Sequence, residues 1–148
     1  MEIKNLYDDS VKQEIIDRIT KLTPASETKW GKMNVSQMLH HCQLPVLAAY
    51  GTIKPRGNFF LRLLGPMFKS VLYNENPYKQ GLPTDKMYII TDEKDFEKEK
   101  TELLNLVEKF SESAVTKLPH PVFGKLSKEQ WSKATWKHLD HHLKQFGV

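Results

Sequence analysis

The residues best suited to chemistry are two histidines near the end of the chain, in the stretch WSKATWKHLDHHLKQ from Trp131 to Gln145. His138 and His142 are four residues apart, and in a helix two side chains at this spacing lie one above the other on the same face. Two imidazoles stacked in this way can bind one metal ion. The spacing therefore indicates a metal site, provided that the stretch is helical.

The periodicity of this stretch predicts a helix with one apolar face. At 100° per residue the tryptophans and leucines share an arc of about 140°, whereas the lysines and Asp140 lie opposite and are expected to be solvated. His138 and His142 flank Trp131 on the buried side, and His141 points toward solvent. A buried imidazole without a partner would cost on the order of 1–3 kcal/mol. Metal binding is therefore as good an explanation for the pair as the alternative, hydrogen bonding within the core.

Helical spacing of apolar residues recurs in several other segments, so the chain is expected to be all-α. Four long helices joined by irregular connections are expected, with a short extra helical or extended segment near 87–90. Capping boxes are predicted at Ser10 with Gln13, at Asn34 with Gln37 and at Ser127 with Gln130, and Gly147 is a candidate left-handed cap. The predicted helices cover 10–22, 34–50, 92–110 and the C-terminal stretch, and 74–86 is expected to be irregular.

The apolar segment 59–73, FFLRLLGPMFKSVLY, has two interpretations. It is either a core helix whose two charges reach solvent, which we favour, or an amphipathic helix lying on a membrane surface. Gly65 and Pro66 are expected to break or kink it midway.

Composition bounds the class of protein. A chain of 148 residues with a net charge of +4 is the size of one domain, and we treat 1–148 as a single unit. The chain has no apolar run long enough to cross a bilayer and no signal-like N-terminus, and Cys42 is its single cysteine. These features favour a cytoplasmic protein without a membrane partner. Because lysines alternate with acidic residues, nucleic acid is not expected as a partner either.

The helix predicted over 34–50 carries the next histidines. His40 and His41 lie on opposite flanks of its apolar face, so only one of them can face a given partner. Pro45 should bend the helix and leaves space on the side of His41, which slightly favours that residue. Cys42 is interpreted as a small buried apolar residue rather than a ligand or nucleophile.

The segments NVSQMLHHC and HLDHHLKQFG resemble the DinB-like family of four-helix-bundle proteins. The likeness is closest to a subfamily described only as a domain of unknown function, in which segments similar to HPVFGKLSKEQW also occur. The resemblance implies a metal site of three histidines completed by water, with His41, His138 and His142 as ligands. It also implies a metal-dependent enzyme, since relatives are described as thiol-dependent transferases, isomerases or hydrolases.

Three neutral imidazoles would leave a coordination position open, as in catalytic metal sites. Zinc, nickel or ferrous iron all suit nitrogen ligands. Such an ion could activate water for a hydrolase or the thiol of a low-molecular-weight cofactor for a transferase, with a small molecule as substrate. No carboxylate is a clear candidate for a general base, which disfavours hydrolysis. The alternative is a non-enzymatic metal- or ligand-binding bundle that serves stability or sensing.

Residues around the site are less well defined. Gln37, Gln145 or a backbone carbonyl is expected to accept the second N–H of a ligating imidazole. His120 is interpreted as a loop residue, with a position at the mouth of the pocket as the alternative. A homodimer is considered because bundle surfaces often pair.

Overall fold

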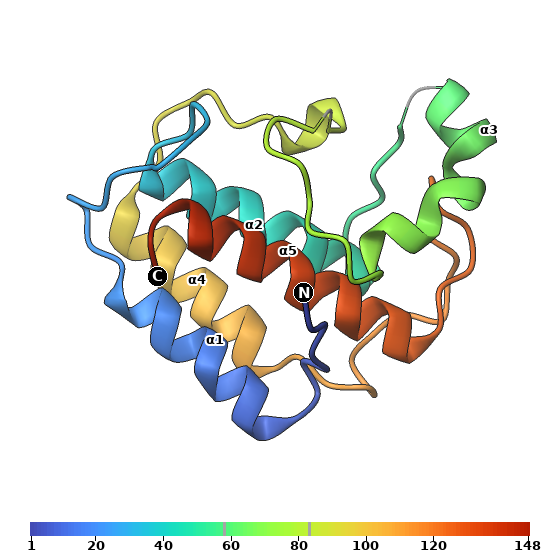
Figure 1. Cartoon of the computed structure of the whole chain (residues 1–148), viewed down its shortest axis with the longest axis horizontal. Helices are drawn as coiled ribbons and strands as arrows, with labels where there is room; N and C mark the ends of the chain where they lie inside the picture. The colour runs from blue at the N-terminus through green and yellow to red at the C-terminus, as the bar shows by residue number, and fades with distance from the viewer. Residues whose placement is uncertain (58, 83) are drawn as a thin grey trace.

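The computed structural model describes residues 1–57, 59–82 and 84–148, and its regular structure is helical (Figure 1). The expectation of an all-α chain is confirmed: the described residues contain no strand, and one isolated antiparallel bridge joins His120 to Gly124. The 87–90 segment contributes to a single 3-10 turn. The helices are α1 (Asp9–Lys21), α2 (Val35–Ala49), α3 (Phe59–Phe68), α4 (Phe96–Glu108) and α5 (Lys128–Gln145), with 3-10 turns η1 (Lys69–Leu72) and η2 (Lys86–Tyr88).

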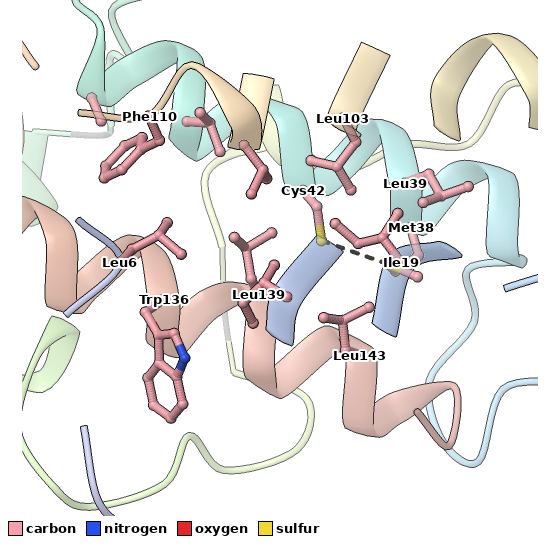
Figure 2. Packing of buried hydrophobic residues seen from close by; sticks show 14 of the residues in the cluster. Leu6, Ile19, Met38, Leu39, Cys42, Leu103, Phe110, Trp136, Leu139 and Leu143 are labelled. Carbon is pink, nitrogen blue, oxygen red and sulfur yellow. Dashed lines mark hydrogen bonds between the residues drawn. The ribbon is translucent and has the colours of Figure 1, made fainter. Parts of the chain in front are cut away.

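Four of these helices pack around one core. α2 lies against α4 and α5, and α1 lies against the same two helices, whereas α3 stands apart from this body (Figure 1). In Figure 2, Leu139 and Leu143 of α5 project toward side chains from the other helices. Burial of these apolar faces is the main force that holds the helices together. The core includes Ile15, Ile19, Met38, Leu39, Cys42, Val46, Leu103, Val107, Trp136, Leu139 and Leu143.

Two of the three predicted capping boxes are present at the helix ends. The boxes at Asn34 with Gln37 and at Ser127 with Gln130 are both present, and Gly147 has a φ of 81° just after α5. The box predicted at Ser10 is wrong, because α1 begins one residue earlier and its N-cap, Asp8, makes no side-chain cap bond. α4 is also shorter than the predicted 92–110, since Asp95 caps it.

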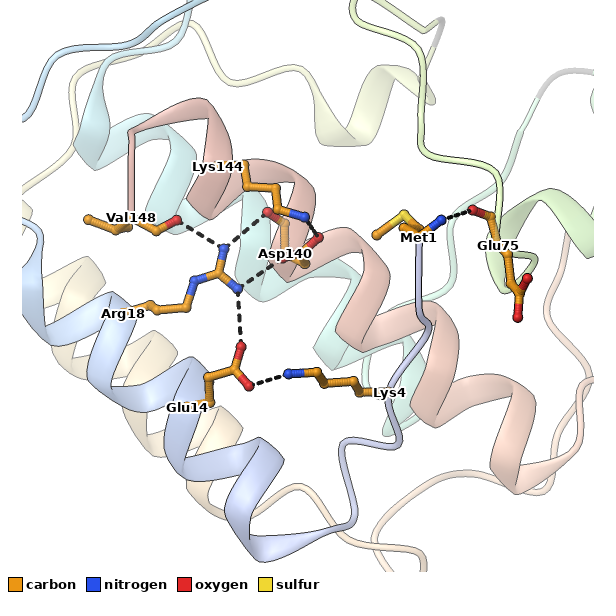
Figure 3. A network of polar contacts seen from close by, with 8 residues as sticks. All are labelled: Met1, Lys4, Glu14, Arg18, Glu75, Asp140, Lys144 and Val148. Atoms are coloured by element: carbon orange, nitrogen blue, oxygen red, sulfur yellow. Dashed lines mark hydrogen bonds and ion pairs between the residues drawn. The ribbon is translucent and has the colours of Figure 1, made fainter.

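The polar side of α5 is not solvated throughout, and the prediction for Asp140 is wrong. Asp140 is buried and accepts a hydrogen bond from Arg18 of α1 at 2.9 Å and another from Lys144 at 2.7 Å (Figure 3). Arg18 also donates to the backbone carbonyl of Val148 at 2.9 Å. Because α1 packs against this side of α5, the carboxylate of Asp140 is buried in an ion pair with Arg18 and is not exposed to water.

Lys137, also placed on the solvated side by periodicity, is buried as well. Its ammonium donates to the carbonyl oxygens of Val71 and Asn74 at 2.7 and 2.9 Å and to Asn74 Oδ1 at 2.9 Å, and it lies 4.5 Å from the centre of the Tyr78 ring. Burial lowers the pKa of Lys137 to about 8. η1 and the segment after it cover this face of α5, and the periodicity of α5 alone could not reveal this cover.

The favoured interpretation of 59–73 as a core helix is wrong. α3 ends at Phe68, continues into η1, and leaves most of its large apolar side chains exposed. Gly65 and Pro66 do not break α3. Gly65 lies against the loop before α5, where an added Cβ would be 2.3 Å from the carbonyl oxygen of Val122. Of the predicted irregular segment, Pro83 lies outside the described residues. No helix among the described residues is long and apolar enough to span a bilayer.

Candidate metal centre

Three histidines from α2 and α5 face one another. The ring centroid of His41 lies 5.0 Å from that of His138 and 4.6 Å from that of His142, and the two α5 rings are 4.6 Å apart. One nitrogen of each ring lies within 4.8 Å of the nitrogens of the other two. Three nitrogens bound to one tetrahedral zinc ion would be about 3.3 Å apart, given bonds of about 2.05 Å. The donor set therefore fits a divalent transition metal after small side-chain movements.

Hydrogen bonds fix the tautomer of His41. Its Nδ1 lies 2.7 Å from the carbonyl oxygen of Tyr88, which can only accept, so in the neutral ring Nδ1 carries the proton. The lone pair is then on Nε2, which lies 3.1 Å from Nε2 of His138. His41 therefore presents an acceptor nitrogen to the cluster.

His142 is oriented in the same way by Gln145. Nδ1 of His142 lies 2.8 Å from Gln145 Oε1, and the amide nitrogen of Gln145 donates to the carbonyl oxygen of Trp30 at 2.6 Å. Because the carbonyl of Trp30 only accepts, it sets the orientation of the Gln145 amide, and Oε1 must accept from His142. The lone pair of His142 is thus also on Nε2. A carbonyl or amide that holds the outer N–H is the usual support of a metal-binding imidazole.

His138 completes the cluster with a different hydrogen-bonding pattern. Its Nδ1 is buried and has no hydrogen-bond partner among the described residues. Its Nε2 faces the lone pair of His41, an arrangement that requires either a proton on His138 Nε2 or a cation shared by the two nitrogens. The close approach of two ring nitrogens is therefore satisfied by one proton or by one metal ion.

Burial keeps the three rings neutral at physiological pH. Removal from solvent is the largest cause of the lowered pKa of His41, and the bond to the Tyr88 carbonyl only partly opposes it. Desolvation holds the pKa of His138 well below its ordinary value and lowers that of His142 to about 3, and the neighbouring histidines add to both shifts. Neutral imidazoles are the form that binds metal, so no proton need be removed at pH 7.

His40 is kept away from the cluster by a second buried acid. Its Nδ1 lies 2.8 Å from Glu99 Oε2, which also accepts a hydrogen bond of 2.7 Å from Gln43. Glu99 is buried in α4 and was missed from the sequence. Its spacing from Phe96 and Leu103 puts it on the apolar face of α4, and that placement was the available signal.

The remaining candidates lie outside the cluster. His141 is half-buried between the rings of Trp30 and Tyr78. His120 lies in the loop before α5, where its Nδ1 accepts hydrogen bonds from the backbone N–H groups of Val122 and Phe123, and it lines a cavity of about 220 Å³.

Two other residues singled out by the sequence have structural roles. Cys42 is buried in the core, as expected, and its sulfur lies 3.5 Å from that of Met38. Gln37 serves the cap of α2 and donates to the carbonyl of Asp92, so it supports no ligand ring.

The backbone carbonyls of Tyr88 and Trp30 are contributors that the sequence did not identify individually. The first belongs to the 3-10 turn η2 and the second to the loop between α1 and α2. Any residue type could supply a backbone carbonyl, so no sequence signal marks them. Among the described residues, the three-histidine cluster includes no carboxylate or thiol.

Fold and site together define an all-helical protein in which one histidine of α2 and a histidine pair of α5 converge. Residues 4–147 match the family described as "Protein of unknown function (DUF1569)", and the chain belongs to that family. No match was found among curated proteins or among solved structures.

Proposed function

We propose that this chain is a metal-dependent enzyme of the DinB-like four-helix-bundle type. His41, His138 and His142 would hold one zinc, nickel or ferrous ion, and the substrate would be a small molecule. The observation that carries the proposal is the convergence of three imidazole nitrogens, two of them with lone pairs aimed inward by bonds to Tyr88 and Gln145. The packing of α1, α2, α4 and α5 around one core supports the bundle type.

The donor set favours a catalytic over a structural ion. Structural zinc sites are closed by four protein ligands, whereas three nitrogens leave a position for water or substrate. His138 and His142 each keep part of their surface accessible, whereas His41 is buried. A bound divalent ion would lower the pKa of a coordinated water or thiol and so supply a nucleophile at neutral pH.

Between the two reactions considered, the cluster favours thiol transfer. Hydrolysis by activated water usually needs a nearby carboxylate as general base. Glu99, the buried acid that contacts α2, is engaged by His40 and Gln43. A thiol activated by the ion itself needs no such base, and a low-molecular-weight thiol is therefore the proposed second component.

A non-enzymatic role is the second candidate, and one distance favours it. The 3.1 Å separation of the His41 and His138 nitrogens is that of a single N–H···N hydrogen bond. One proton shared between His41 and His138 can therefore satisfy these two nitrogens without a metal ion. In that case the cluster would be a buried polar contact that stabilises the packing of α2 against α5.

Elemental analysis of protein purified without a histidine tag separates these candidates. We expect one transition metal per chain, lost in His138→Ala and His142→Ala but kept in His141→Ala, the matched control on the same helix. His41→Ala should lose metal and His40→Ala should keep it. Wild-type protein with metal is then screened with thiol cofactors plus electrophiles, and with simple esters and amides. Equal loss in His141→Ala would overturn the ligand set, and metal without turnover would favour the binding role.

A further inference from the structure

α3 exposes an apolar face that the four-helix body does not cover. Phe59, Phe60 and Met67 are each at least 70% exposed, and Leu63, Leu64 and Phe68 are exposed as well. At 100° per residue these six side chains occupy an arc of about 180° centred between Phe60 and Met67. So many large apolar side chains gathered on ten residues exceed what a solvated helix normally shows.

The opposite side of α3 explains why this face points outward. Gly65 lies about 150° from the centre of the apolar arc. It is buried against the Val122 carbonyl, and Pro66 lies beside Gly124. Because only a glycine permits this approach, the contact sets the rotation of the helix about its axis. The apolar arc is therefore directed away from the protein. Figure 1 shows that α3 itself stands apart from the four-helix body.

The charge around this face is entirely positive along the chain. Residues 51–73 contain four cations, Lys54, Arg56, Arg62 and Lys69, and no aspartate or glutamate. The supporting segment 113–127 adds Lys117 and Lys125, again without an acid. None of the four cations of 51–73 forms an ion pair with a described residue. Asp85 contacts the segment, and both its oxygens accept hydrogen bonds from backbone N–H groups, those of Gly57 and Met87.

We propose that α3 is an interfacial helix that docks the protein on a bilayer containing anionic lipids. α3 carries phenylalanine, leucine and methionine on one face and Arg62 on the opposite face, and this division is typical of helices that lie in the headgroup region. The ten residues of α3 are too few to cross a membrane, so the helix lies on it. The absence of a bilayer-spanning run does not bear on such a surface helix, and the interpretation of 59–73 as a core helix, which we favoured over a membrane-surface helix, is wrong.

A second copy of the chain fits this face less well. A two-fold symmetric contact places the same patch of both subunits together. Lys54, Arg56, Arg62 and Lys69 of both copies would then add positive charge near the contact, with no acid of residues 51–73 to neutralise it. Anionic headgroups supply the opposite charge, and each nearby lysine or arginine strengthens binding about fivefold.

Vesicle co-sedimentation of the full chain tests the proposal. We expect binding to vesicles of phosphatidylcholine with phosphatidylserine, weakened by salt, and little binding to phosphatidylcholine alone. The double variant Leu63→Gln with Met67→Gln should lower the partition coefficient more than tenfold, because two apolar side chains that would be buried in the bilayer are replaced by polar ones. Arg62→Glu should lower it about tenfold or more. These positions are exposed, so circular dichroism should show unchanged helix content.

Matched controls are Ile89→Gln, an exposed apolar residue outside this surface, and Lys98→Glu, an exposed charge on α4. Both should bind vesicles as the wild type does. Equal loss in a control and in its partner variant would overturn the proposal, as would absence of binding to anionic vesicles. A dimer in sedimentation velocity that Leu63→Gln with Met67→Gln converts to monomer would assign the face to a second copy instead.

Discussion

At the scale of single residues, the candidate metal centre depends as much on the groups behind the imidazoles as on the imidazoles themselves. Gln145 links His142 to the backbone of Trp30 through two hydrogen bonds of 2.8 and 2.6 Å. The backbone carbonyl of Tyr88 holds the ring of His41 directly, by accepting a hydrogen bond from its Nδ1. These partners keep the proton on Nδ1 and hold each ring so that the lone pair of Nε2 faces the cluster. The site is therefore preorganised for an ion.

Replacement of Gln145 by leucine should weaken zinc affinity roughly 10–100-fold without removing a ligand. The cause is loss of the acceptor that holds the N–H of His142, which frees the ring to rotate. Competition with a chromogenic chelator measures the affinity. Gln37→Leu is the control, because Gln37 caps α2 and contacts no ligand ring, so its zinc affinity should stay at the wild-type value. A similar loss in both variants would mean that Gln145 acts only through stability.

At the scale of elements, α5 is held from several sides at once. One side supplies the core leucines and the two ligand histidines, and another is tied to α1 through the pair of Arg18 and Asp140 (Figure 3). Hydrogen bonds from Lys137 connect α5 to η1 and to the segment that follows it. These contacts fix the rotation of α5 about its axis and its axial position relative to α2. As a result, the histidines of the two helices face one another.

Asp140→Ala should destabilise the protein by about 3 kcal/mol, because Arg18 would be left largely buried without its counter-charge. The free energy of unfolding is measured by urea titration with a chelator present, so that metal does not contribute. Asp17→Ala removes an exposed carboxylate of α1, and its effect should stay within about 0.5 kcal/mol. A loss in Asp140→Ala no larger than that would show the pair to be energetically neutral.

At the scale of the whole molecule, buried neutral histidines make stability depend on pH. Desolvation lowers the pKa of His120 to about 4, against about 6.5 in the unfolded chain. Between these values the unfolded state binds more protons than the folded state, so stability falls as the pH falls. Protonation of Nδ1 would also remove the acceptor of the Val122 and Phe123 N–H groups.

His120→Asn should therefore reduce the loss of stability between pH 7 and pH 5 by on the order of 2 kcal/mol. Asparagine keeps an oxygen that can accept the N–H two residues ahead, and it does not titrate. Urea unfolding of both proteins at the two pH values, with chelator, isolates this residue because the other histidines contribute equally to both. An unchanged pH dependence would place the pKa of His120 near its ordinary value.

Local sequence determined the helices and the phase of α5. The capping boxes at Asn34 and Ser127 and the spacing of His138 and His142 are written within a few residues, and short-range sterics and hydrogen bonding suffice to read them. His41 was preferred over His40 by a slight local signal and by family resemblance. Glu99, which engages His40, lies far away in the sequence.

Only the tertiary structure decided what each helix face meets. Periodicity separates apolar from polar sides, but it does not say whether another segment will cover the polar one, as happens at Lys137 and Asp140. For the same reason an apolar run such as α3 could be read as core when it lies outside. Convergence of His41 with the α5 pair, and the carbonyls that orient them, arise from contacts between distant segments, where packing of the whole chain outweighs local preference.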